Sequence, residues 1–411
     1  MKICLISVIH LWVNPRLVKE ADALVEEGHT VVAITLAQDS WSYKRDKEFC
    51  KTKSWQVIQI NMVKDNLRGC VTWFFMALRQ KVFFELSKIF KNDLRIAGEA
   101  YCRGYSSLLR KALNCKTDFY IAHTQAALPI AARAAEQRGV RFGFDCEDLN
   151  AEANADGGRH PLIRKNIRLL EQNYLLKAAY VTAASTPMAE YLSKQYVISL
   201  PTVIHNVFPK SELKDILEPL RRPHNKRVSM VWISATIGQG RGLEMAIEAM
   251  KRLPDCELHI FGRFVDRDFE IKFKKNITQS MTNSVFIHEV IPNLSMLRGI
   301  SQYDVGLALE DGSCPNLGLT LTNKFFIYLQ AGLTVAASDV SGQRSFIEKH
   351  PQIGFLIMPN NSDAFCEKIL EYYTDREKLA KGKQSAWELG MEKYNWEHDK
   401  QIFLKAVYES V

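Results

Sequence analysis

The segment around Lys324 combines helix-capping side chains with a cation. Thr320, Thr322 and Asn323 suit the start of a helix near Asn323, and Gly332 suits its end. Lys324 then stands in the first turn, where the helix dipole disfavours a positive charge unless an anion binds there too. The spacing therefore predicts either a bound phosphate or a lysine that reaches into solvent.

A second stretch with the same chemistry covers residues 233–244. An apolar run is followed by a loop with Gly238, Gly240 and Gly242, and then by a helical pattern. Arg241 brings a planar cation to that helix start, where backbone N–H groups favour anions. The pattern indicates a diphosphate clamp or an ordinary glycine turn with a solvated arginine. It matches neither the dinucleotide-binding nor the Walker glycine motif.

The composition is that of a folded protein with material for two cores. The chain has 411 residues, 47% of them hydrophobic, and a formal net charge of +8. This mild basic excess suits an anionic ligand or surface, but no zinc-finger, RNP or basic-helix signature indicates nucleic acid binding. The nine cysteines form no C-x-x-C pair, which favours free thiols in a reducing, cytoplasmic compartment.

The apolar run at residues 3–13 raises the question of a signal peptide. Only Lys2 precedes the run, His10 interrupts it, and Asn14, Pro15 and Arg16 follow it in place of a cleavage site. A first buried strand is the better interpretation. No window reaches the roughly 18 uninterrupted apolar residues of a membrane span.

Apolar runs typical of parallel strands alternate with helical patterns along both halves of the chain. In the first half these runs cover residues 2–9, 31–36, 118–124, 141–148, 179–185 and 202–206. In the second half they cover residues 228–234, 257–262, 284–290, 304–310, 333–338 and 354–359. A charged linker at residues 212–227 separates the halves. Ligands of such sheets bind at the carboxyl ends of the strands.

The order of these segments resembles glycosyltransferase family 4, whose members transfer sugars from nucleotide sugars and have the GT-B fold. In the second half the resemblance rests on RGLE, HIFG, DVGLALE, NKFFIYLQAGLTVAASD and GQ. In the first half it rests on NPRLVKEADALVEEGHTV, IAHTQ, FDCEDL and VIHN, and at the end on NWEHDKQIFLKAVYES. The order of the motifs carries the resemblance, because no single motif is decisive.

The resemblance implies an α/β protein with two Rossmann-like domains that face each other across a cleft. Residues 1–207 would form an acceptor-binding domain and residues 208–390 a nucleotide-sugar-binding domain. Residues 391–411 would form a terminal helix that packs back on the first domain.

The resemblance also implies roles for individual residues. His123 would face the donor sugar, and Arg241 and Lys324 would hold its diphosphate and stabilise the departing nucleotide. A buried histidine satisfied by its neighbours is the alternative for His123. Further substrate contacts would come from Asn14, Arg16, Asp145, Glu147, Gly238, Gly240, Thr322 and Asn323. For Asp145 and Glu147 the alternative is that they are exposed loop acids.

The chain departs from the family at a pair of glutamates. The second of these, which holds the nucleotide ribose, would stand five residues before Gly332, but Ile327 is there. The first would stand at Leu319. Glu310 and Asp311 are candidate substitutes, with solvated loop acids as the alternative.

The expected activity is therefore transfer of a sugar from a UDP- or GDP-linked donor to a glycan or lipid-linked acceptor, in surface polysaccharide or glycoconjugate biosynthesis. The resemblance implies retention of anomeric configuration and no need for a metal, and no D-x-D triplet stands where a metal-dependent transferase would require it. The missing glutamates favour an alternative, an inactive nucleotide-sugar-binding or partner subunit. A nucleotide-sugar epimerase on the same architecture is a third hypothesis.

Residues 73–91 interleave aromatic and basic side chains. One hypothesis is a helix that contacts the anionic inner face of a membrane. The other, which we favour, is a helix whose aromatic side lies in the domain core while its lysines face water.

Overall fold

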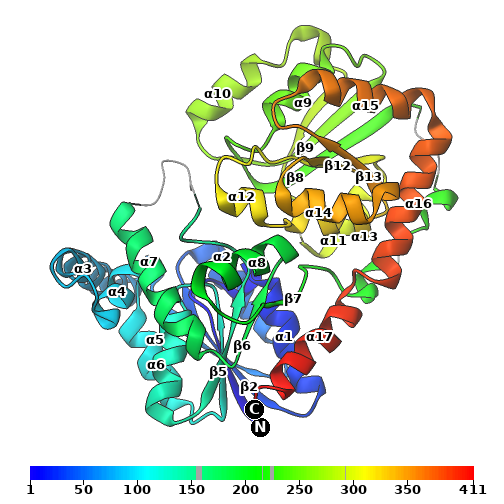
Figure 1. The fold of residues 1–411 in the computed structure, drawn as a ribbon. Helices are drawn as coiled ribbons and strands as arrows, with labels where there is room; N and C mark the ends of the chain where they lie inside the picture. The colour runs from blue at the N-terminus through cyan, green and yellow to red at the C-terminus, as the bar shows by residue number, and fades with distance from the viewer. Residues whose placement is uncertain (154–159, 215, 223–225, 292) are drawn as a thin grey trace. The chain divides into compact units, whose positions relative to one another are not determined.

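The chain forms two compact units in the computed structural model, which describes residues 1–153, 160–214, 216–222, 226–291 and 293–411 (Figure 1). Unit 1 comprises Met1–Ala184, Met188–Ile204 and Lys400–Val411. Unit 2 comprises Ser185–Pro187 and His205–Asp399. Residues 215 and 223–225, which belong to the predicted linker, lie outside the described residues.

Within the described residues, unit 1 is built on a seven-stranded parallel sheet of order β3-β2-β1-β4-β5-β6-β7. The strands are β1 (Lys2–Ile6), β2 (Thr30–Ala37), β3 (Gln56–Asn61), β4 (Phe119–His123), β5 (Arg141–Cys146), β6 (Tyr180–Ala183) and β7 (Thr202–Val203). The helices of this half are α1 (Pro15–Glu26), α2 (Ser40–Cys50), α3 (Leu67–Ile89), α4 (Leu94–Tyr101), α5 (Tyr105–Asn114), α6 (Leu128–Arg138), α7 (Pro161–Tyr174) and α8 (Thr186–Tyr196).

Helix α1 shows how local sequence positions the first elements. Asn14 caps the helix by accepting a hydrogen bond from the backbone N–H of Leu17, and Pro15 begins it. Leu17, Ala21 and Leu24 are fully buried against the sheet. The apolar start of the chain is the buried strand β1, as predicted from its flanking residues.

Unit 2 is built on a six-stranded parallel sheet of order β10-β9-β8-β11-β12-β13 in the part of the chain that the structure describes. The strands are β8 (Val228–Ile237), β9 (Cys256–Phe264), β10 (Val285–His288), β11 (Val305–Ala308), β12 (Thr334–Ser338) and β13 (Gly354–Ile357). The helices are α9 (Leu243–Met250), α10 (Arg267–Lys275), α11 (Asn293–Ile300), α12 (Pro315–Leu319), α13 (Asn323–Gln330), α14 (Ser341–Lys349), α15 (Ser362–Thr374) and α16 (Arg376–Glu392). Helices cover both faces of this sheet, with α9 and α15 on one side and α13 and α14 on the other (Figure 1).

The terminal helix α17 (Trp396–Tyr408) contacts unit 1, as predicted. Lys400 forms an ion pair with Glu26, which ends α1. The hydroxyl of Tyr408 lies 3.2 Å from a carboxylate oxygen of Glu27. Two parallel Rossmann-like sheets with this returning helix confirm the predicted fold class.

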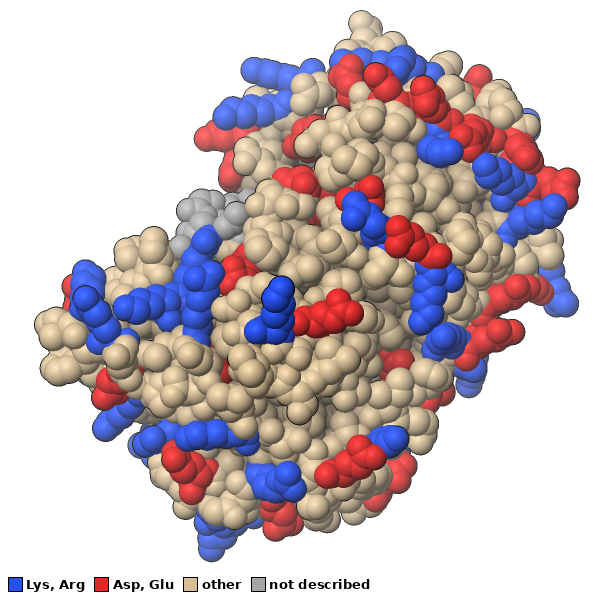
Figure 2. All heavy atoms as spheres, in the orientation of Figure 1, with Lys and Arg blue, Asp and Glu red and all other residues tan. Residues whose placement is uncertain are grey.

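Our prediction that the aromatic side of residues 73–91 lies in the core is wrong. Phe74, Phe75 and Phe90 are exposed, and Trp73, Phe83 and Phe84 are only half-buried. Met76 and Ser87 are the buried residues of this stretch. Figure 2 shows basic side chains among uncharged ones on the side of the molecule where Figure 1 places α3. The pattern does not indicate which side packs, because α3 carries apolar residues on both of its faces. No helix among the described residues is long and apolar enough to cross a membrane.

Candidate functional site

A glycine in strand β11 determines how closely helix α13 packs against the sheet. A Cβ atom at Gly306 would lie 2.2 Å from Cγ of Tyr328, so only glycine lets α13 approach the strand this closely. The Tyr328 hydroxyl then accepts a hydrogen bond of 3.0 Å from the backbone N–H of Ile233 in β8. These contacts hold the start of α13 beside the carboxyl ends of β8 and β11.

Lys324 is buried in the first turn of α13. Its Nζ atom lies 2.8 Å from Oε1 of Glu310, whose side chain is fully buried just after β11. The same ammonium lies 5.0 Å from the ring centre of Trp232, a fully buried residue of β8. Lys324 therefore does not reach into solvent, and that alternative is excluded.

Arg241 approaches the same carboxylate from the loop before α9. Its Nη1 atom lies 3.7 Å from Oε2 of Glu310, and about a third of the side chain is exposed. Gly242 has a φ of +66°, and a Cβ atom there would lie 2.7 Å from Cβ of Leu309. The loop thus needs glycine at this position to bring Arg241 to Glu310.

Lys324, Arg241 and Glu310 together carry a net positive charge, because two cations face one carboxylate. Burial and the positive charge of Arg241 lower the pKa of Lys324, although the Glu310 carboxylate opposes them. One carboxylate faces two cations, and the N-terminal dipole of α13 adds a further partial positive charge. This arrangement favours binding of an additional anion.

The other residues predicted in unit 2 lie around this cluster in different ways. The backbone N–H of Asp311 donates to the carbonyl of Gly240, which joins the glycine loop to the end of β11. Thr322 is the N-cap of α13, yet its enclosed hydroxyl has no hydrogen-bond partner among the described residues. Asn323 is exposed and Gly238 is buried.

The structure also locates the two positions where family glutamates are absent. Ile327 is buried in α13, with 5% of its surface exposed. Leu319 ends α12 half-buried, and its carbonyl accepts a hydrogen bond from the hydroxyl of Ser185. The Glu310 carboxylate is held by the two cations, which defines it as their counter-ion in this conformation.

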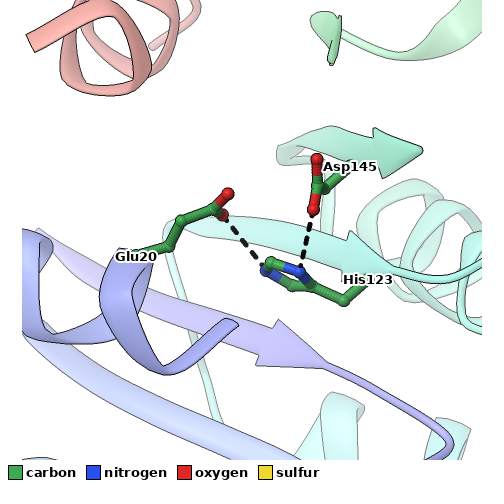
Figure 3. Close-up of side chains that lie close together, drawn as sticks. All are labelled: Glu20, His123 and Asp145. Carbon is green, nitrogen blue, oxygen red and sulfur yellow. Dashed lines mark ion pairs between the residues drawn. The ribbon is translucent and has the colours of Figure 1, made fainter. Parts of the chain in front are cut away.

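Unit 1 contains a separate buried network of charges. His123 lies between two carboxylates, with Nε2 3.2 Å from Glu20 and Nδ1 3.3 Å from Asp145 (Figure 3). Arg16 contacts Asp145 at 2.5 Å and donates to the carbonyl of Ile204 at 2.8 Å. None of these charged side chains is more than 1% exposed.

The network holds His123 and Asp145 in their charged forms, whereas burial raises the pKa of Glu20. Burial alone would lower the pKa of His123, but the Glu20 and Asp145 carboxylates raise it to about 10. Burial alone would raise the pKa of Asp145, but Arg16 and His123 lower it to about 2. These directions indicate an imidazolium clamped by two acids.

The cluster of Glu20, His123 and Asp145 offers three metal-ligating atoms close together, but its geometry is that of ion pairs. The two carboxylates approach opposite nitrogens of the imidazole (Figure 3), whereas one metal ion binds only one of them. The guanidinium of Arg16 already neutralises Asp145. These residues do not fit a metal site.

The remaining predicted residues of unit 1 have structural contacts. Asn14 caps α1 and donates to the hydroxyl of Ser7. Glu147, just after β5, is half-buried. Burial and the charge of Asp145 raise the pKa of Glu147 to about 7.

Two residues that complete these clusters were not predicted from the sequence. Trp232 lies in an apolar run that predicts only a buried strand, and nothing in that run predicts the contact between its ring and the ammonium of Lys324. Glu20 lies on the apolar face of α1 between Leu17 and Leu24, and an acid at such a position is the signal that was available.

The fold has relatives of known structure. HepE from Anabaena, in complex with UDP-glucose, has a TM-score of 0.70 and 14% identity over 99% of each chain. The chain has a GT-B fold. A sucrose-phosphate synthase from Thermosynechococcus elongatus has a TM-score of 0.70 and 14% identity, over 99% of this chain and 98% of that one. A glycosyltransferase from Rickettsia africae has a TM-score of 0.67 and 16% identity, over 100% and 98%.

Sequence comparison adds nothing to this GT-B likeness: no family model and no curated protein matches the chain. At such low identity the likeness establishes the fold alone. The likeness is therefore one of fold, and the activity has to be argued from the chain's own residues.

Proposed function

We propose that unit 2 binds the diphosphate of a nucleotide sugar at Lys324 and Arg241, and that the protein transfers the sugar to a glycan or lipid-linked acceptor. The observation that carries this proposal is the convergence of both cations on Glu310 at the carboxyl ends of β8 and β11. The carboxyl edge of a parallel sheet is where such folds bind nucleotides.

The chemistry required of this site is charge stabilisation. As the bond between sugar and diphosphate breaks, negative charge grows on the leaving phosphate. In this proposal Lys324 and Arg241, with the backbone N–H groups at the start of α13, would stabilise that charge. Cationic side chains and a helix dipole at this place perform the role that a metal ion has in other transferases, so we propose a metal-independent reaction.

Retention of anomeric configuration is the finer part of the proposal. The leaving phosphate would take the proton of the acceptor hydroxyl on the same face of the sugar, so that no enzymic nucleophile is required. A uridine nucleotide is the first donor to test, because the similar HepE was solved with UDP-glucose.

A second candidate function is a subunit that binds nucleotide sugar without transferring it. The observation in its favour is Ile327, which is buried in α13 where an active relative would place a ribose-binding glutamate. A site that holds phosphate well and ribose poorly would bind a nucleotide without orienting it for reaction.

One experiment separates the two functions. Purified protein is titrated with UDP and GDP by calorimetry and then incubated with a panel of UDP- and GDP-sugars, and release of free sugar is followed by NMR. Binding together with slow release of sugar of unchanged configuration supports the transferase. Binding without any release supports the second candidate, and absence of binding contradicts both.

A further inference from the structure

Helix α3 presents an apolar stripe to solvent. Seven apolar residues of the helix are exposed, among them Leu67 at 82%, Phe75 at 63% and Ile89 at 72%. The full set is Leu67, Val71, Phe74, Phe75, Leu78, Val82 and Ile89. At 3.6 residues per turn these positions fall within roughly 100° of the helix circumference. From Leu67 to Val82 the stripe is continuous, and the exposed acid Glu85 falls within the same arc before Ile89. At 1.5 Å per residue the whole helix is about 35 Å long.

The opposite face of α3 anchors it to unit 1. Met76 and Ser87 are buried on that side, and Asn166 of α7 donates to the hydroxyl of Ser87. Arg79 pairs with the buried carboxylate of Glu99 in α4 through two contacts of 2.7 and 2.9 Å. The stripe is thus held outward by a helix fixed to the domain, and it is not a loosely attached segment.

Basic side chains border the stripe. In helical projection Lys81 and Lys88 follow one edge and Arg68 the other, and all three are exposed. Glu85 is the only acid of α3, and it pairs with Lys88 at 2.6 Å. On the other side of the helix, the ammonium of Lys64 lies 3.4 Å from the ring centre of the half-buried Trp73. An apolar face with cationic borders and interfacial aromatic residues has the chemistry that an anionic bilayer surface recognises.

Charge also argues against a second copy of the chain as the occupant. Self-association of the stripe would bring the bordering Arg68, Lys81 and Lys88 of one α3 against the same residues of the other, with one acid on each side. We propose that α3 lies flat in the headgroup region of an anionic membrane, with Phe74, Phe75 and Leu78 in the apolar boundary and Lys81 and Lys88 at the phosphates. This inference is independent of the proposed catalytic function.

Vesicle flotation tests the proposal. Full-length protein should float with phosphatidylcholine vesicles that contain phosphatidylglycerol, and should float much less with phosphatidylcholine alone. Phe74→Ser with Phe75→Ser should lower partitioning roughly tenfold or more, because two aromatic rings no longer leave water. Lys81→Glu with Lys88→Glu should lower it to a similar extent on anionic vesicles, and added salt should weaken wild-type binding.

A matched control replaces exposed apolar residues elsewhere in unit 1. Leu176→Ser with Leu200→Ser removes two side chains that are 61% and 63% exposed, and should leave flotation unchanged. All variants should keep the wild-type unfolding temperature. The proposal is overturned if the wild type does not float with anionic vesicles, or if the Phe74 and Phe75 variant floats like the wild type. The stripe would instead bind a second copy of the chain under one combination of results. In that case the wild type is a dimer by light scattering, the Phe74 and Phe75 variant is a monomer, and neither protein floats with vesicles.

Discussion

The ammonium of Lys324 lies 2.8 Å from the carboxylate of Glu310, with both groups buried at the carboxyl edge of the unit 2 sheet. Arg241 approaches the other oxygen of the same carboxylate. Glu310 is therefore the resident anion of a site with two cations, and an incoming diphosphate would take over part of its role. These two ion pairs allow the predicted phosphate binding to be tested by changing the charges of the three side chains one at a time.

Glu310→Gln should strengthen binding of nucleoside diphosphates and lower the free energy of unfolding of the unliganded protein. Without the carboxylate two cations face each other, so we expect a loss of about 2–3 kcal/mol in the free energy of unfolding, partly recovered by UDP. Calorimetric titration and thermal unfolding with and without UDP measure both effects. Weaker UDP binding would show instead that Glu310 contacts the ligand, as a substitute for the missing ribose-binding glutamate.

Gly242→Ala should damage both stability and anion binding. The residue has a φ of +66°, and the new methyl group would lie 2.7 Å from Leu309, so the loop that carries Arg241 must shift. We expect a cost of about 1–3 kcal/mol in unfolding free energy. Gly318→Ala is the matched control, because nothing lies within 4 Å of its added Cβ atom and its φ lies outside the left-handed range. Equal unfolding temperatures for the two variants would contradict the close approach at Gly242.

His123→Leu should destabilise unit 1, because it leaves Glu20 and Asp145 buried without their shared partner. A loss of about 3 kcal/mol in unfolding free energy is expected, measured by urea denaturation. UDP affinity at the unit 2 cluster should stay within twofold of wild type. An unchanged stability would mean that the imidazolium is not clamped as the structure has it.

Glu147 predicts a pH dependence of stability. Its pKa is about 7 in the folded protein, above the ordinary value of 4.5, so the folded state binds the extra proton between these values. The protonated side chain of Glu147 therefore contributes its full stabilisation below pH 4.5, and this stabilisation is lost as the pH rises through about 7. Glu147→Gln should flatten this decline, raising stability at pH 7.5 by about 1–2 kcal/mol. Parallel unfolding curves of variant and wild type from pH 5 to pH 7.5 would contradict the assignment.

The sequence predicted the parts of the fold that have strong periodicity. The buried strands and the start of α13 at Asn323 follow directly from apolar runs and capping residues. Helix α2 and strand β3 were not predicted from the sequence. The first has charged residues in most of its turns, and the second is a half-buried edge strand, so neither has a clear apolar period.

The candidate site was predictable as a place but not as a set of contacts. The resemblance to family 4 grouped Arg241 and Lys324 at a diphosphate, and Glu310 was a candidate only for the missing ribose contact. The pairing of Lys324 with Glu310 depends on how deeply Tyr328 seats against Gly306, which is a packing detail that spacing does not encode. The exposure of α3 was likewise hidden, because apolar residues on both faces give no sign of which face packs.

The most direct test of the proposed function is the affinity of Lys324→Ala for UDP and GDP. The account predicts a loss of at least tenfold, about 1.4 kcal/mol or more, because a buried ammonium in the first turn of α13 would no longer meet the phosphates. Lys251→Ala, which removes an exposed lysine of the same unit, is the control and should bind like the wild type. An affinity of Lys324→Ala within twofold of the wild type would contradict the account.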